Sequence, residues 1–194
     1  DLAMFAYGNT GSKSNLKNLV TNQGVVGANV TGVGTARGDL AASRYGVGLA
    51  IFGYGNTGSY VSMTNLVTNV GVVGSDVTGV GTVRRSLAAC TFGVGKAIFG
   101  FGRDGSNELS VTNLVSDVGV VAADTTGVGT AREKLGACSF GGDKGIFAFG
   151  VVNGGAGRVS MSNLVSNSGV VASDTTGVGS ATNRLAAAGF SFSA

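Results

Sequence analysis

The sequence predicts an all-β fold, and three observations support this. Val, Thr, Phe and Tyr mix with frequent glycine, at 36 of 194 residues, which is typical of short strands joined by turns. No window places apolar residues at the 3.6-residue spacing of a helix. The third observation is an internal repeat. With 43% hydrophobic and 12% charged residues, the composition indicates a packed domain and not a disordered chain.

Five motifs recur four times in the same order: an aromatic strand, NLV, GVV, TGVG and LAA (LGA in one copy). The spacing is set by Phe5, Phe52, Phe99 and Phe147, which lie 47, 47 and 48 residues apart. A repeat of this length predicts stacked supersecondary units. We therefore expect a single domain, residues 1–194, of four units with approximate bounds 1–48, 49–95, 96–143 and 144–194.

Each unit is predicted to hold four short strands. Examples are residues 87–93, 96–102, 61–68 and 71–76, separated by Gly or Asn. In the second strand type, Ala97, Phe99 and Phe101 alternate and are expected on one face of the sheet.

A single sheet of this kind cannot bury both of its faces, but four sheets packed around an axis can. The chain begins on a strand of the second type, residues 3–8, and ends on LAAAGF, residues 185–190, which is the first type. Pairing of these two ends would complete one blade and remove two strand edges. The sequence thus predicts a four-bladed β-propeller closed by its N- and C-terminal strands, with blades offset from the repeats.

Residues 84–102, RRSLAACTFGVGKAIFGFG, resemble the Kelch repeat: an arginine, a small-residue strand, an aromatic, a short turn and a strand ending in glycine. The resemblance covers all four units, with Thr182 in the arginine position of the last. Gly-x-Gly replaces the usual glycine pair, the usual Trp is missing, and Kelch rings generally have more than four blades. The resemblance implies a propeller used mostly for binding. A looser likeness is to divergent repeats of virus and phage particle proteins and marine microbial sequences.

The loop between the second and third strands is where the units differ most, in length and in content. Its copies are residues 9–13, 56–60, 103–108 and 151–158. Loops at one end of a rigid scaffold commonly carry binding, and short polar side chains suit hydroxyl-rich ligands such as glycans. The alternative is four solvated turns. The predicted ligand-binding residues are Asn9, Thr10, Ser12, Asn56, Thr57, Ser59, Tyr60, Arg103, Asp104 and Asn153.

Two further residue sets recur in the units. The aromatic positions predict core packing between blades, with a stacking platform for sugars or bases as the alternative. The second set, acidic and basic, predicts an Asx turn with an internal ion pair; a calcium site and an arginine ring for sulfated or sialylated glycans are the alternatives. Its members are Asp76, Asp124 and Asp174 with Arg37, Arg84 and Arg132.

Composition argues against several functions. The chain has no His, which removes histidine-based catalysis and metal triads, and TGVGT lacks the lysine of a phosphate loop. We expect no enzyme activity, no metal and no cofactor. A net charge of +3 does not indicate nucleic-acid binding. The sequence has no run of 18 apolar residues, which membrane insertion as a helix would need.

The leading functional hypothesis is a non-catalytic binding module for a glycan or another cell-surface ligand, extracellular or on the surface of a virus or phage particle. The alternative is a structural propeller that contacts other subunits of a particle. An oligomer is compatible with both.

Overall fold

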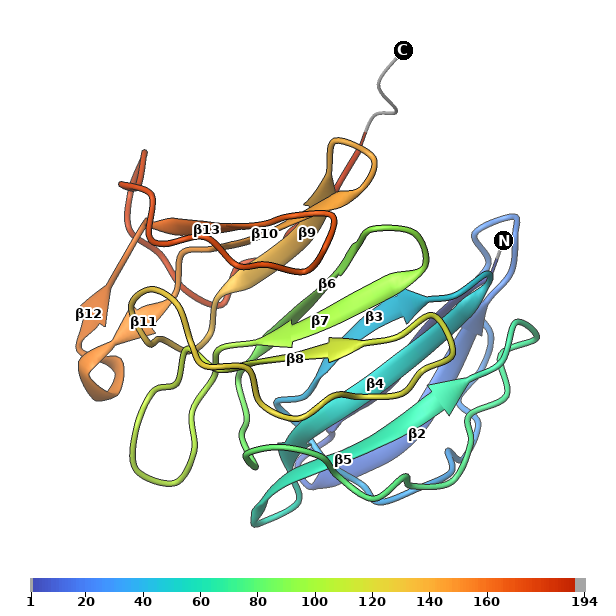
Figure 1. Ribbon diagram of the computed structural model, residues 1–194. Coiled ribbons are helices and arrows are strands. Elements are labelled where there is room, and N and C mark those ends of the chain that lie inside the picture. Colours follow the sequence, from blue (N-terminus) through green and yellow to red (C-terminus); the bar gives the residue numbers. More distant parts are fainter. Residues whose placement is uncertain (1, 191–194) are drawn as a thin grey trace.

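The computed structural model describes residues 2–190 and shows an all-β chain (Figure 1). Its one helical segment in this range is the short 3-10 turn η1 (Asn153–Gly155), so no helix there could cross a bilayer. The strands are β1 (Ala3–Asn9), β2 (Lys13–Val20), β3 (Ala41–Tyr45), β4 (Leu49–Asn56), β5 (Tyr60–Val67), β6 (Ala88–Phe92), β7 (Lys96–Gly100), β8 (Thr112–Val115), β9 (Gly136–Phe140), β10 (Lys144–Ala148), β11 (Val151–Val152), β12 (Gly157–Arg158) and β13 (Ser162–Val165).

Three of the four predicted strands are confirmed in the first three units, whereas residues 185–190 of the last unit form no strand and leave β10 and β13 as its confirmed strands. The middle strands β4, β7 and β10 each pair antiparallel with a strand on both sides, giving the sheets β3-β4-β5, β6-β7-β8 and β9-β10-β13. The predicted fourth strand is reduced to isolated bridges, such as Val67 with Val73 and Thr64 with Val77. Glycines in this segment weaken strand formation, which accounts for the short pairing.

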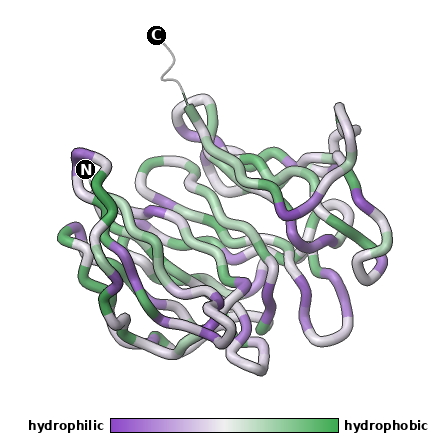
Figure 2. The backbone as a smooth tube through the Cα atoms, turned by 180° about the vertical axis from the view of Figure 1, so that it is seen from behind, coloured by the Kyte–Doolittle hydropathy of each residue, from purple (hydrophilic) through white to green (hydrophobic). Residues whose placement is uncertain are grey.

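The sheets follow one another as a stack, and hydrophobic residues follow the strands between them (Figures 1 and 2). Separate core clusters lie between the first and second, second and third, and third and fourth sheets. One aromatic pair crosses each junction, at ring-centroid separations of 5.2–5.4 Å: Tyr7 with Phe52, Tyr54 with Phe99, and Phe101 with Phe147. The two middle sheets are therefore covered on both faces by their neighbours.

The aromatic rings do not follow simple alternation. Phe99 packs against Tyr54 of the preceding sheet, whereas Phe101 packs against the following sheet. The prediction that Ala97, Phe99 and Phe101 share one face therefore holds for Ala97 and Phe99, which lie in one core cluster, and is wrong for Phe101. The backbone of Phe101 is left-handed, at φ 63, and the corresponding residue of every other unit has the same conformation. This local kink turns the side chain to the opposite face.

Glycine allows the close approach of neighbouring sheets. A Cβ atom at Gly53 would lie 2.8 Å from Cζ of Phe99, and one at Gly100 would lie 2.7 Å from Cζ of Phe147. Alanine takes this position in the first unit, where Ala6 packs against the cluster that contains Phe52.

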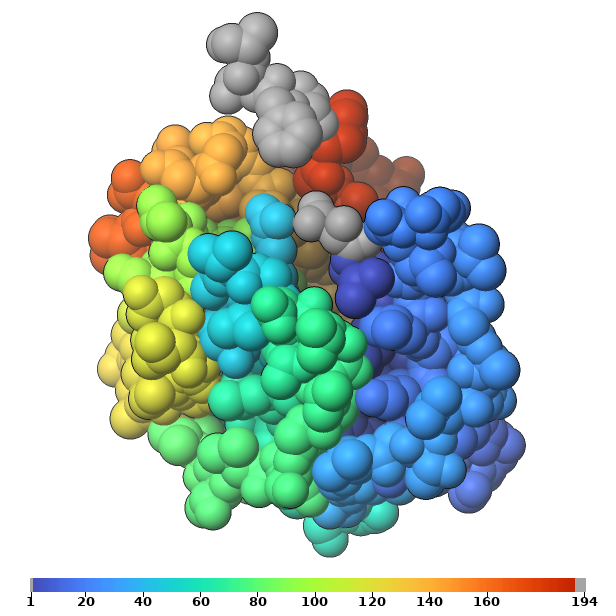
Figure 3. Space-filling view, turned by 90° about the vertical axis from the view of Figure 1, so that its right-hand side faces the viewer, coloured from blue at the N-terminus to red at the C-terminus, as the bar shows by residue number. Residues whose placement is uncertain are grey.

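The predicted closure of the ring is wrong for the described residues. β1 pairs with β2 only, and the first unit lies at one side of the stack (blue in Figure 3). Segment 185–190 lies instead against β9, where a Cβ at Gly136 would be 3.2 Å from Cγ of Leu185. The contacts that join each sheet to the next thus carry the chain forward and do not return it to β1. The molecule shows several small antiparallel sheets and not a closed four-bladed propeller.

The aromatic core prediction is confirmed at the inner junctions and wrong at the two ends. Phe52 is 7% exposed and Tyr45 is 3% exposed. The equivalent residues at the ends, Phe5 and Phe190, are 65% and 93% exposed, because no neighbouring sheet covers them.

Candidate functional site

The variable loops lie at one end of the stack, which we call the loop end. It is opposite the tight turns that join the first and second strands of each sheet (Figure 1). Bridges tie the second, third and fourth loops to the segments that enter the first strands: Gly38 with Asn56, Arg85 with Arg103, and Glu133 with Val151.

Most of the predicted ligand-binding side chains in the second and third loops bind their own turns. Asn56 Oδ1 accepts a hydrogen bond of 2.8 Å from the Gly58 N–H. Thr57 donates its hydroxyl to the Ser59 carbonyl at 3.2 Å, and Asp104 Oδ1 accepts two backbone N–H groups at 2.7 Å each. These contacts are typical of Asx and Ser/Thr turns, so the side chains shape the loops.

The remaining loop residues are distributed across separate units. Arg103 pairs with Glu108 at 2.9 Å, and Glu108 Oε1 also accepts the Gly154 N–H at 2.8 Å, which joins the third loop to the fourth. Four other predicted residues are exposed in the first and fourth loops, and the structure does not bring them to one point: Asn9, Thr10, Ser12 and Asn153.

Tyr60 is the predicted loop residue that reaches the segment entering the next sheet. The guanidinium carbon of Arg85 lies 5.1 Å from the centre of the Tyr60 ring, within the range of a cation–π contact. Arg85 also pairs with Asp39, at 3.5 Å between Nη1 and Oδ2. Residues of one loop and two interstrand segments thus converge beside the entry to β6.

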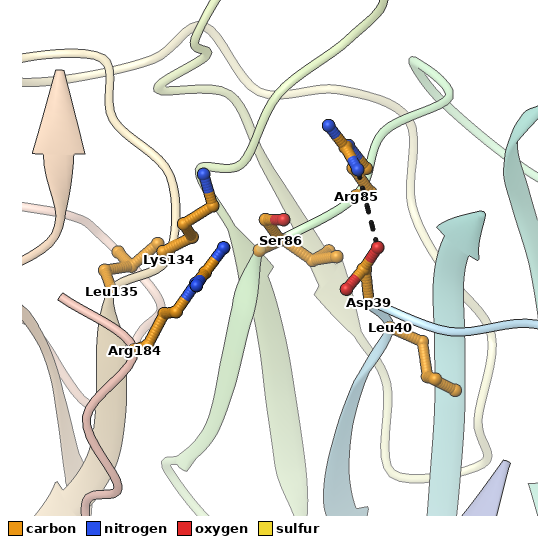
Figure 4. A pocket seen from close by; sticks show the side chains of 8 residues that line it. Asp39, Leu40, Arg85, Ser86, Lys134, Leu135 and Arg184 are labelled. Carbon is orange, nitrogen blue, oxygen red and sulfur yellow. Dashed lines mark ion pairs between the residues drawn. The ribbon is translucent and has the colours of Figure 1, made fainter. Parts of the chain in front are cut away.

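This convergence borders a pocket of about 400 Å³ at the loop end (Figure 4). Arg85 lines it together with four residues in equivalent positions of the units, each followed by a leucine: Asp39, Ser86, Lys134 and Arg184. The four share a left-handed backbone, at φ 55. A ladder of backbone hydrogen bonds, each 2.8 Å, runs from each N–H to the preceding carbonyl in the series.

The four side chains differ although their backbones are the same. The ladder uses only N–H and C=O groups, so the fold does not require a particular side chain at Asp39, Ser86, Lys134 or Arg184. Sequence reasoning missed this set. The signal was present, because these positions vary between the units although they lie immediately before a leucine that all four units keep.

The pocket is cationic. Its lining has three cations, Arg85, Lys134 and Arg184, against the carboxylate of Asp39. Lys134 Nζ also contacts Glu133 Oε1 at 2.7 Å, and Oε2 of this buried Glu133 has no hydrogen-bond partner within residues 2–190. Arg184 is exposed and forms no ion pair with any described residue. An exposed guanidinium next to an ammonium group suits a carboxylate, sulfate or phosphate.

Comparison with known proteins gives no family for the chain. No protein-family model matches it, and no curated protein matches it. The chemistry of the site therefore follows from its own residues.

The recurring arginines lie elsewhere, buried between the sheets. Arg84 is fully buried, with its guanidinium carbon 4.1 Å from the centre of the Tyr54 ring in the preceding sheet. In its own sheet, its Nε donates to the Phe101 carbonyl at 2.9 Å and its Nη2 to Asn113 Oδ1 at 2.7 Å. Arg37 and Arg132 repeat this arrangement. They cannot form the arginine ring for anionic glycans that the sequence left open.

The recurring aspartates complete the same junctions. Asp124 lies 3.9 Å from Arg84 and accepts hydrogen bonds from the Thr82 N–H and hydroxyl and from Asn113 Nδ2. The predicted internal ion pair is confirmed here and in the pairs Arg37–Asp76 and Arg132–Asp174. No group of three or more possible metal ligands occurs among residues 2–190, so the structure gives no support to a calcium site.

The pKa values of the ion-paired residues at these junctions are shifted from their ordinary values. Burial alone raises the pKa of the Asp124 carboxyl, but hydrogen bonds from Thr82 and Asn113 and the charge of Arg84 outweigh it, and the pKa is lowered. Burial lowers the pKa of the Arg132 guanidinium to about 10, with the Asp174 charge acting in the opposite sense. The Asp124 carboxylate and the Arg132 guanidinium are therefore both charged at neutral pH.

The two cysteines are free thiols. Cys90 is buried, and burial raises the pKa of its thiol to about 12. A buried thiol with a raised pKa makes Cys90 a poor nucleophile.

We predict that Arg84→Met lowers the free energy of unfolding by about 3 kcal/mol, since it leaves Asn113 and Asp124 without their cationic partner. This is the low end for a buried ion pair, because the Asp124 side chain is 29% exposed. Urea denaturation measures the effect. Arg44→Met, at an exposed arginine of β3, is the control and should change stability by less than about 0.5 kcal/mol. Equal effects of the two substitutions would contradict the role of the junction.

We also predict a loss of stability in acid. The pKa of Asp124 is lower in the folded than in the unfolded chain, so its contribution is present above about pH 4 and is lost as the pH falls through the folded value. Urea denaturation at pH 7 and pH 3 should show a smaller pH-dependent difference for Asp124→Asn than for the original chain. An unchanged difference would mean that the carboxylate does not contribute.

Proposed function

We propose that the protein is a non-catalytic binding module that holds an anionic group, carried by a glycan or another surface ligand, in the pocket at the loop end. The observation that carries the proposal is the cationic set of Lys134 and Arg184 on a rigid backbone ladder that does not depend on their side chains. Side-chain variation at positions of constant backbone favours a role outside the fold.

The pocket offers donors of complementary kinds. Arg184 presents a planar fork that matches a carboxylate or sulfate, Lys134 presents an ammonium group that also pairs with Glu133, and the hydroxyl of Ser86 adds a neutral donor. Arg85 is partly neutralised by Asp39 and holds the Tyr60 ring beside the pocket. A sulfated or sialylated sugar could place its charge on the cations and its ring against Tyr60.

The hypothesis drawn from the sequence, a binding module outside the cell or on a particle surface, also applies to the rest of the loop end. Kelch-like repeats are used mostly for binding, and a place outside the cell or on the surface of a virus or phage particle agrees with a chain that displays its loops at one end. The predicted turns, including Asn56, would then contact the parts of the ligand that are not charged.

A structural role is the second candidate, and one observation favours it. β1 has no partner on its outer edge among the described residues, and Phe5 beside that edge is exposed. Exposed strand edges and apolar faces are typical of surfaces that contact other protein chains.

The double substitution Lys134→Gln with Arg184→Gln tests the anion site. Its affinity for a sulfated polysaccharide, measured by isothermal titration calorimetry, should fall at least about tenfold, because a hydrogen bond to a charged group contributes about 1.5–3 kcal/mol. Lys96→Gln with Lys144→Gln removes the same charge from exposed lysines at the opposite end and is the control. Equal losses would mean that net charge alone drives binding.

The loops are tested separately with Tyr60→Ala and Asn56→Ala. We expect Tyr60→Ala to weaken binding of the same polysaccharide about threefold to tenfold, through loss of an aromatic contact, without a change in the circular dichroism spectrum. Asn56→Ala should act on its turn and have a smaller effect. Unchanged binding by Tyr60→Ala would remove the second loop from the site and leave the cationic pocket to be judged alone.

A further inference from the structure

We propose that the pocket at the loop end accepts one negative charge from its ligand, and that Glu133 sets this limit by holding Lys134. The ligand class that fits is a singly charged acidic sugar, with its carboxylate on Arg184. Because the same pocket is concerned, the inference rests on the proposed function.

Three cations line the pocket, and within residues 2–190 only one of them has no carboxylate partner. Nη1 of Arg85 lies 3.5 Å from Oδ2 of Asp39, and Nζ of Lys134 lies 2.7 Å from Oε1 of Glu133. Arg184 is exposed and forms no ion pair with another described residue. Two carboxylates therefore neutralise two of the three cations, and one positive charge remains for a ligand.

The carboxylate of Glu133 depends on Lys134 as a donor. The Glu133 side chain is only 3% exposed, and its Oε2 atom has no hydrogen-bond partner in the part of the chain that the structure describes. If the ammonium group left, a buried carboxylate would lose its charge-assisted hydrogen bond, which is costly. Lys134 therefore does not give its charge to a second anionic group. An ammonium group has three donors, so it can still donate a hydrogen bond to a ligand from within the pair.

The pair of Asp39 and Arg85 lies apart from Arg184. The ladder of backbone hydrogen bonds places the rungs in the order Asp39, Ser86, Lys134 and Arg184. Figure 4 shows the Arg85–Asp39 pair on one side of Ser86 and the two other cations on the opposite side. An anion on Arg184 is therefore next to Lys134, and the charge of Lys134 is the one that decides how many anionic groups the site can hold.

The fold does not require a carboxylate at position 133. Glu133 pairs through its backbone with Val151, in the same kind of bridge that Gly38 forms with Asn56. Glycine has no side chain, so the bridge depends on N–H and C=O groups alone. The equivalent residues of the four units are Gly38, Arg85, Glu133 and Asn183. A neutral residue is therefore compatible with this backbone, which favours a role of the Glu133 charge in the pocket.

These charges suit a ligand with a single carboxylate. The Arg184 guanidinium can hold a carboxylate with two parallel hydrogen bonds, and Lys134 can add another. A second anionic group on the ligand would find Lys134 already neutralised by Glu133. We therefore expect a sialylated sugar to bind about as well as a multiply sulfated sugar of similar size.

The first experiment compares two ligands by isothermal titration calorimetry: sialyllactose, which has one carboxylate, and a disaccharide with two sulfates. For the original chain we expect affinities within about fivefold of each other, because a second charge without a free cation contributes little. Glu133→Gln should raise the preference for the disulfated sugar about tenfold, because it releases Lys134 as a second cation. A preference of the original chain beyond this range, or one that Glu133→Gln leaves unchanged, overturns the inference.

Asp143→Asn is the matched control. Asp143 and Lys144 form the same kind of pair between neighbours in sequence, at 3.1 Å, but at the end opposite the pocket. The substitution changes the net charge by the same amount as Glu133→Gln and should leave the preference unchanged. An equal gain in both variants would mean that net charge alone acts, which contradicts a specific role of Glu133.

A second experiment tests whether Glu133 acts through Lys134. Glu133→Gln combined with Lys134→Gln should show no gain, whereas a purely structural effect of Glu133 would persist without the lysine. Glu133→Asn, which copies Asn183, takes the place of Glu133→Gln if the latter lowers stability in urea. A gain that persists in the double variant overturns the inference.

Arg184→Gln separates this inference from the proposed function. Equal binding of sialyllactose by the original chain and by Arg184→Gln overturns both, because the pocket would then hold no anion. A loss of at least about tenfold in Arg184→Gln, with an unchanged preference in Glu133→Gln, keeps the anion site and overturns the role of Glu133 alone.

Discussion

The buried arginine between successive sheets is the interaction on which the rest of the structure depends. It stacks on an aromatic ring of one sheet, donates to a carbonyl and an asparagine of the next, and is neutralised by an aspartate. A charge removed from water is tolerated only when all of these partners are in place. Each junction therefore permits one relative placement of its two sheets, and three such junctions give the stack its shape.

This constraint explains why one left-handed residue followed by glycine recurs in every unit, with a second glycine before it in the two middle units. The left-handed residue turns its ring towards the following sheet, where the next arginine covers it. The glycine at Gly53 or Gly100 leaves room for the phenylalanine of that sheet. Both features serve the junction, so variation between units is confined to positions that the junction does not use. Those positions gather at the loop end, and the cationic pocket is made of them.

The same constraint relates the two functional proposals. A rigid stack displays side chains from several units at one end, as a binding surface requires, and it leaves a bare face at each end of the succession. Loss of both members of the buried ion pair at these faces, Thr182 and Asn29, removes the cost of an unpaired charge.

The sequence by itself determined the all-β class, the four units, three strands of each of the first three units, the aromatic core of the inner junctions and the ion pairs, because these depend on repeat spacing, alternation and residue type. It could not reveal that Phe101 turns to the opposite face, since a single left-handed residue breaks the alternation on which that prediction relied. Only the tertiary structure decided whether the ends meet and which side chains converge. The angle between successive sheets follows from packing at each junction. Lys134 and Arg184 are 50 residues apart in sequence, and a backbone hydrogen bond between them brings them together.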